Sequence, residues 1–187
     1  MFEIPDNLHP DCISLAWLLG AWEGTGEVVY PTIKTRSFRQ RIEFSQTGKP
    51  FLYYLSRSWE IDPDGKALGP LNMETGFWRP RPADQEEGED AIPIEVLLSH
   101  PTGFLEAMLG EIRGPRIEIA TSKVIKVESA KDYRRGHRLY GHIPAGAEMP
   151  PYPPVPVSQL MWVYEMEAMG EPLQPHISAA LSRVPVD

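Results

Sequence analysis

Histidine is the side chain in this chain best suited to metal or acid–base chemistry, and one of its five histidines, His176, has small neighbours. It lies in the run PLQPHISAALSRV near the C-terminus. In a strand that starts at His176, side chains alternate between two faces, so Ser178, Ala180 and Ser182 share its face. Such neighbours leave room for a flat ring system beside the imidazole. A single imidazole ligand also leaves a metal centre open to a small molecule. The alternative is an ordinary surface histidine, which is the usual finding for an isolated one.

The other four histidines offer weaker prospects. His9 lies in an N-terminal arm and is expected to be solvated, and His100 directly precedes Pro101 and is expected to be a turn residue. His137 and His142 flank a basic cluster, where either could reach the edge of a bound cofactor. The spacings H-x-H and H-E-x-x-H do not occur in the sequence, so no zinc site is predicted.

A glycine-rich motif lies near the start of the chain. Gly20, Trp22, Gly24 and Gly26 form the spacing G-x-W-x-G-x-G, which differs from the G-x-G-x-x-G of dinucleotide-binding folds. No helix is predicted after it, so a phosphate-binding loop is not expected. We interpret the motif structurally: the glycines let a first strand bend sharply while Trp22 fills one end of the fold.

Nucleophilic catalysis has no support in the sequence. The spacing G-x-S-x-G is absent, and Cys12, the single cysteine, has no histidine in a recognisable motif with it. One cysteine also excludes an intrachain disulfide, which fits a reducing compartment. The apolar stretch 13–22 lacks the flanks of a signal peptide and is too short to span a bilayer. We therefore expect a cytoplasmic protein.

Charge excludes two classes of partner. The net charge is −8 over 187 residues, and the lysines and arginines are scattered except for Lys131, Arg134, Arg135 and Arg138. A nucleic-acid-binding protein normally presents a basic face, and anionic membranes attract one as well. Neither nucleic acid nor membrane is an expected partner.

The elements that must position these residues are strands. Apolar and polar residues alternate in short runs separated by glycines and prolines, which predicts about ten antiparallel strands. We therefore predict one all-β domain over residues 1–187, an up-and-down barrel, after a short helical turn over 11–19 with Asp11 as its N-cap. The predicted strands cover 21–30, 35–45, 51–61, 73–79, 92–100, 103–109, 116–122, 124–129, 137–142, 160–166 and 177–184.

A proline-rich segment, IPAGAEMPPYPPVPV at 143–157, separates two of the predicted strands. We interpret it as an elongated hairpin loop or lid that prolines stiffen. A polyproline ligand for an SH3-like partner is the alternative. An edge strand beside this segment would make a homodimer plausible.

Taken together, the motifs resemble those of the nitrobindin family. GAWEGTGEVVYPTI is similar to the family signature, and GKPFL, ETGF, HPTG, AKD and GEPLQPH follow in order over residues 18–184. The family has a calycin-like, fatty-acid-binding-protein-like barrel. The segment 143–157 is the main departure from its compact pattern.

This resemblance implies a function and a site. It implies ferric haem b held by His176 as the axial iron ligand, with Thr32 near the haem and the cationic Lys131 or Arg138 meeting its propionates. Lys131 and Arg138 are otherwise expected on a solvated barrel rim. Met161 and Met166 are expected either in the pocket wall or in the core. The implied activities are binding of nitric oxide and isomerisation of peroxynitrite to nitrate.

A rival function remains open on the sequence alone. The same barrel without metal could carry a fatty acid or another apolar molecule, with Arg57 and Tyr140 holding its carboxylate. The physiological ligand, the oligomeric state and the role of 143–157 lie beyond what the sequence decides.

Overall fold

The computed structural model describes residues 4–85, 89–148, 150–151 and 153–185, and over these residues the chain is an antiparallel β protein. Its strands are β1 (Gly20–Tyr30), β2 (Ile33–Ser45), β3 (Leu52–Ile61), β4 (Ala67–Pro80), β5 (Ile92–His100), β6 (Phe104–Arg113), β7 (Arg116–Lys126), β8 (Tyr133–Ile143), β9 (Gln159–Ala168) and β10 (Glu171–Arg183). Two short 3-10 helices, η1 (Pro10–Leu18) and η2 (Pro82–Asp84), accompany them. No helix in these ranges has the length and apolar character that a membrane crossing needs.

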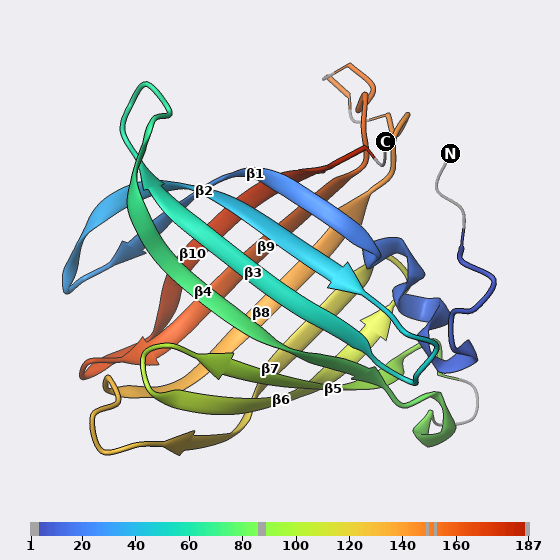
Figure 1. The fold of residues 1–187 in the computed structure, drawn as a ribbon, viewed down its shortest axis with the longest axis horizontal. Coiled ribbons are helices and arrows are strands. Elements are labelled where there is room, and N and C mark those ends of the chain that lie inside the picture. The colour runs from blue at the N-terminus through green and yellow to red at the C-terminus, as the bar shows by residue number, and fades with distance from the viewer. Residues whose placement is uncertain (1–3, 86–88, 149, 152, 186–187) are drawn as a thin grey trace.

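The strands close into a barrel. Each pairs with its neighbours in the chain, and β1 also pairs with β10, from Trp22 opposite Arg183 to Val28 opposite Ile177 (Figure 1). The predicted up-and-down barrel is confirmed. Both β8 and β9 have two partners, so the edge strand expected beside the proline-rich segment is not formed.

One end of the barrel is closed by η1. The helix packs beside the start of β1 (Figure 1), and Trp22, fully buried, donates its indole N–H to the Leu18 carbonyl at 2.8 Å. The ring of Trp17 stacks on that of His142, with centroids 5.1 Å apart. The predicted role of Trp22 in filling one end of the fold is thus confirmed.

Several predicted element boundaries are wrong. Residues 116–122 and 124–129 were expected as two strands, but β7 joins them as one strand that ends at Lys126. Its pairing with β6 shifts register within the strand, because a bulge and not a turn interrupts the alternation. The N-cap of η1 is His9, whose Nδ1 accepts the Asp11 amide at 3.2 Å. Asp11 therefore does not cap the helix, and His9 is not simply solvated.

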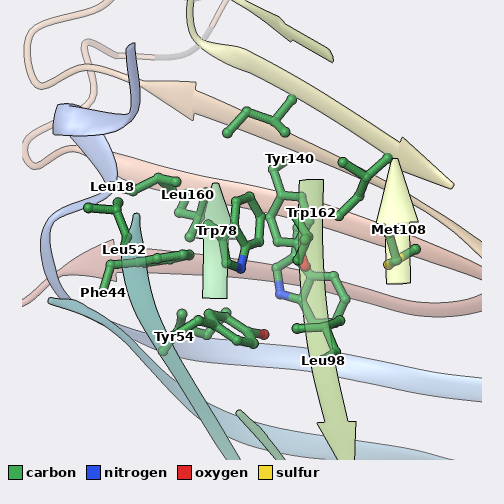
Figure 2. Close-up of a cluster of buried hydrophobic side chains, with 14 of the residues drawn as sticks. Leu18, Phe44, Leu52, Tyr54, Trp78, Leu98, Met108, Tyr140, Leu160 and Trp162 are labelled. Carbon is green, nitrogen blue, oxygen red and sulfur yellow. The ribbon is translucent and has the colours of Figure 1, made fainter. Parts of the chain in front are cut away.

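Aromatic side chains fill the middle of the barrel. Figure 2 shows Trp78, Tyr140 and Trp162 meeting there from β4, β8 and β9. The Trp78 and Tyr140 rings meet edge to face at 5.1 Å, and the Tyr140 and Trp162 rings stack at 5.6 Å. Burial of such large rings contributes strongly to stability, and their packing fixes the side chains between the two ends of the barrel.

Candidate functional site

The end of the barrel opposite η1 carries His176 in β10. The strand starts at Glu171, five residues before this histidine, and its pairing with β9 shifts register between Pro175 and Ile177. His176 is the extra residue of this bulge, and a bulge can re-aim a side chain. Its ring lies against the buried rings of Tyr30 and Tyr164.

The bulge corrects one prediction about this strand. Ser178 and Ala180 are exposed on the outer face, whereas Ala179 and Leu181 are buried in the core. His176 therefore does not share a face with Ser178, Ala180 and Ser182 as expected. The prediction assumed uninterrupted alternation from His176 onward, and the bulge removes that assumption.

The hydrogen bond of His176 fixes which ring nitrogen is free. Nδ1 lies 3.0 Å from the Val29 carbonyl oxygen, which can only accept, so Nδ1 carries the proton. The lone pair is then on Nε2, the arrangement seen in histidines that bind metal. Burial lowers the pKa of His176, and the charge of Arg138 lowers it further, although the bond to Val29 opposes both. The imidazole is accordingly neutral at neutral pH.

Two tyrosines hold the His176 ring from its sides. The Tyr30 ring meets it edge to face at 5.3 Å, and the Tyr164 ring does so at 5.6 Å. The Tyr30 hydroxyl is tied to the β9 backbone, because it lies 3.1 Å from the Met166 carbonyl and accepts the Ala168 amide at 3.0 Å. This places the β1 end, the β9 end and the β10 bulge in one rigid arrangement.

The turns at this end expose apolar side chains. Large hydrophobic residues with 37–62% exposure lie on the strand ends and connections there: Ile33, Leu68, Ile125, Val127, Met169 and Leu173. Exposed apolar surface that gathers in one place marks a site for a ligand or partner. Thr32 and Lys131 lie on the same end, exposed on the β1–β2 turn and on the β7–β8 connection.

Arg138 is inside the barrel. It is 2% exposed, and its two Nη atoms donate to the two carboxylate oxygens of Glu74 at 2.7 and 2.9 Å. The solvated rim position considered for it is therefore wrong. Burial alone would raise the pKa of Glu74, but the charge and hydrogen bonds of Arg138 outweigh burial and hold that pKa at about 2. The pair is ionised throughout the physiological range.

His100 is a second member of this buried network. Its Nδ1 faces Glu74 and its Nε2 faces Glu106, each at 3.5 Å, and its side chain is 6% exposed. The ring stacks on Phe104, with centroids 4.2 Å apart. His100 ends β5 and its carbonyl accepts the Gly103 amide, as expected of a turn residue, but folding also brings two carboxylates from β4 and β6 to its two nitrogens.

The remaining predicted residues lie away from His176. His137 faces outward, where its nitrogens meet Glu118 at 2.9 Å and Glu165 at 3.2 Å. His142 is at the closed end, against Trp17. Neither reaches the edge of a ligand at His176. Of the two methionines, Met166 packs against the core and Met161 is exposed on the outer face.

The side chains proposed for a lipid carboxylate are not brought together either. Arg57 points outward and donates to Glu43 at 2.5 Å, whereas Tyr140 is fully buried. Tyr140 stacks on Trp162 and meets the edge of Trp78 in the region where a fatty-acid carrier holds its ligand. The described interior is therefore occupied by side chains and internal ion pairs.

The fold and this site define a class of protein: a closed antiparallel barrel that presents one neutral imidazole, with Nε2 free, at one end. Such a donor set suits a macrocycle-bound metal, because a bare ion needs several protein ligands. The described residues contain no group of three or more His, Cys, Asp or Glu side chains that could hold a metal ion.

Comparisons with known proteins agree with this class. Residues 11–183 match the family described as the THAP4-like, heme-binding β-barrel domain. A protein of Nocardioides sp. named peroxynitrite isomerase is 42% identical over 97% of this chain and 98% of its own length. A ferric nitrobindin-like protein of Kineococcus radiotolerans is 38% identical over 92% of each chain. The crystal structure of Rv2717c from M. tuberculosis superposes with a TM-score of 0.71 at 29% identity, covering 95% of this chain and 99% of that one.

The chain belongs to the nitrobindin family of haem-binding β-barrels. The family resemblance inferred from the motifs is thereby confirmed.

Proposed function

We propose that this protein binds haem b through Nε2 of His176 and isomerises peroxynitrite to nitrate, with nitric oxide as a further ligand. The observation that carries the proposal is the neutral His176 imidazole at the barrel end opposite η1, with Nδ1 held by the Val29 carbonyl and Nε2 free. The relatives named peroxynitrite isomerase support the reaction.

The residues present fit the group. The imidazole is of the type that binds haem iron, and Tyr30 and Tyr164 fix its ring plane. The exposed apolar side chains on the surrounding turns provide contacts for an apolar macrocycle, and Lys131 provides a cation for its carboxylates. We assign Thr32, on the β1–β2 turn two residues beyond Tyr30, to the same pocket.

The chain's own residues have a limited chemical task. Bound ferric haem supplies an open Lewis-acidic iron position at which peroxynitrite rearranges to nitrate. His176 holds the group and donates electron density, while Val29 keeps the proton on the opposite ring nitrogen. Isomerisation neither consumes nor releases a proton, so no protein acid or base is required. The unpaired thiol of buried Cys12 fits a reducing cytoplasm.

The test is a hemin titration of the purified protein and of His176→Ala, followed by visible absorption. His137→Ala is the matched control, because it removes a partly exposed histidine on the outer face of β8. We expect a sharpened Soret band in the wild type and in the control that is lost in His176→Ala. The loaded wild type should then convert peroxynitrite to nitrate faster than free hemin does.

Two results would overturn the proposal. Identical spectra of loosely associated hemin in all three proteins would remove the haem assignment. A fluorescent fatty acid that bound with a one-to-one stoichiometry would in that case establish the lipid carrier instead.

A further inference from the structure

The buried pair of Arg138 and Glu74 is unusual for the interior of a small barrel. Both side chains are almost fully buried, and the two Nη–carboxylate bonds form a fork that fixes the guanidinium plane. Removing two charges from water is costly. A protein in which apolar residues of similar volume replace a buried ion pair is often at least as stable as the protein with the pair. The pair is therefore weak evidence for stability and raises the question of what the cation contacts.

The face of the guanidinium lies over an aromatic ring. The Arg138 Cζ is 4.5 Å from the centroid of the Tyr164 ring, which is within cation–π range. The Tyr164 ring is also packed closely against Gly136 in β8. A Cβ added to Gly136 would overlap Cε2 of Tyr164 and approach the Tyr133 hydroxyl to 2.9 Å. The position of the Tyr164 ring is thus set by the Arg138 cation and by the close approach of the Gly136 backbone.

Tyr164 in turn contacts the proposed haem ligand. Its ring meets that of His176 at 5.6 Å with an interplanar angle of 65°. Tyr30 and the Val29 carbonyl constrain the same imidazole from β1. A continuous set of packed groups therefore runs from Glu74 in β4 through Arg138 and Tyr164 to the bulge in β10.

We propose that Arg138 is a positioning residue for the haem ligand, acting through Tyr164 on the orientation of His176 while Glu74 holds the guanidinium in place. This rests on the proposed function in one respect, that His176 is the ligand. Both Nη atoms of Arg138 donate to Glu74, so this role would need no contact between the guanidinium and the haem. Its charge is nevertheless buried close to the ligand, so it also favours the reduced over the oxidised iron.

The assignment predicts effects of opposite sign for the two partners. Arg138→Gln removes the cation that lies over Tyr164. Glu74→Gln removes a buried anion but leaves the cation, and its amide oxygen keeps one of the two acceptors that hold the guanidinium. Groups that orient a metal-bound histidine typically contribute about 10- to 100-fold to metal affinity. We expect Arg138→Gln to weaken hemin binding by about that factor and to lower the reduction potential. Glu74→Gln should lose less affinity than Arg138→Gln, because one acceptor still holds the guanidinium, and it should raise the potential.

The experiment combines three measurements on the full chain. Hemin titration gives the affinity, spectroelectrochemistry gives the potential, and nitrogen-15 NMR of the haem-free protein reports the His176 ring. In the wild type, Nδ1 should give a protonated signal and Nε2 an unprotonated one, and Arg138→Gln should broaden or mix these signals. Trp22→Phe is the control, because it loosens the closed end of the barrel without contacting Tyr164. It should leave all three readouts unchanged.

The outcomes separate this inference from the proposed function. Wild-type affinity, potential and His176 signals in a folded Arg138→Gln protein would overturn the positioning role while leaving haem binding intact. Hemin binding that survives His176→Ala would instead refute the ligand assignment. If Arg138→Gln does not fold, the double variant Glu74→Gln/Arg138→Gln replaces the ion pair with two amides of similar size. It should still lose about tenfold in affinity, because the stacked cation is gone.

Discussion

At the scale of single residues, the buried carboxylate of Glu74 meets a cation and an imidazole that come from two other strands. The assignment of His176 is a prediction that rests on the family pattern in the run before it. Nothing local to His100 or Arg138 indicates that they meet Glu74, which lies 26 residues before one and 64 before the other along the chain. Only the barrel register brings β4, β5 and β8 side chains together. Polar residues at inward positions of predicted strands are the one signal that could have found them.

Glu74 carries a prediction about acid stability. Its pKa is lowered from 4.5 to about 2 in the folded protein because Arg138 outweighs the effect of burial. A lowered carboxyl pKa stabilises the fold above the unfolded-state value, and this stabilisation is lost as pH falls toward the folded-state value. We expect a loss of about 3 kcal/mol between pH 5 and pH 2 that is absent in Glu74→Gln. Urea unfolding across this pH range measures it.

The matched control for this prediction is Glu167→Gln. Glu167 pairs with Arg135 at 2.7 Å on the surface, where solvent weakens the interaction. This variant should keep the acid dependence of the wild type. A Glu74→Gln protein with that same dependence would show that the buried pair does not set the acid stability.

At the scale of elements, the strand count and the antiparallel order followed from alternation, but the bulges did not. A bulge adds one residue and interrupts the alternation as a turn does, so a pattern of period two does not distinguish a bulge from a turn. The bulge at His176 is the consequential one, because it turns the imidazole toward Tyr30 and Tyr164. The glycines of the first strand were interpreted correctly as structural, and the structure supplies the reason.

Gly24 shows that reason most clearly. An added Cβ would overlap the Ala180 carbonyl oxygen and lie 2.8 Å from the Leu181 Cα, both in the backbone of β10. Backbone cannot move aside as a flexible side chain can, so Gly24→Ala must push β1 from β10 at the closure of the barrel. Overpacking of this kind costs about 1–3 kcal/mol, and we expect Gly24→Ala to lie at the upper end. Thermal and urea unfolding measure the loss.

Gly141→Ala provides the comparison for this substitution. Gly141 lies in β8, and a Cβ there would meet no atom within 4 Å. Its stability should be equal to or slightly above that of the wild type, since alanine restricts the unfolded chain. Equal losses in the two variants would mean that the β1–β10 contact does not require glycine.

At the scale of the whole molecule, the two ends of the barrel have different tasks. The η1 helix, Trp22 and Trp17 close one end, while the turns at the other end surround His176. The proline-rich segment joins β8 to β9 on the closed side (Figure 1), where the Ser158 carbonyl accepts the Arg183 amide at 2.9 Å. The sequence alone did not assign this segment to one end of the barrel. Successive hairpins alternate between the two ends, so the assignment depends on the order of all the strands.

Replacing residues 145–157 with a short turn should therefore leave the haem site intact. The pairing of Ile143 with Gln159 sets the base of this hairpin, so a tight connection there preserves the register of β8 and β9. The loss of the hydrogen bonds that Val155 makes with Gly146 and Ala147 lowers stability slightly. We expect unchanged hemin affinity and a small decrease in Tm, measured by titration and thermal unfolding. Weaker hemin binding in a folded protein would mean that the segment acts on the far end, against its position at the closed end of the barrel.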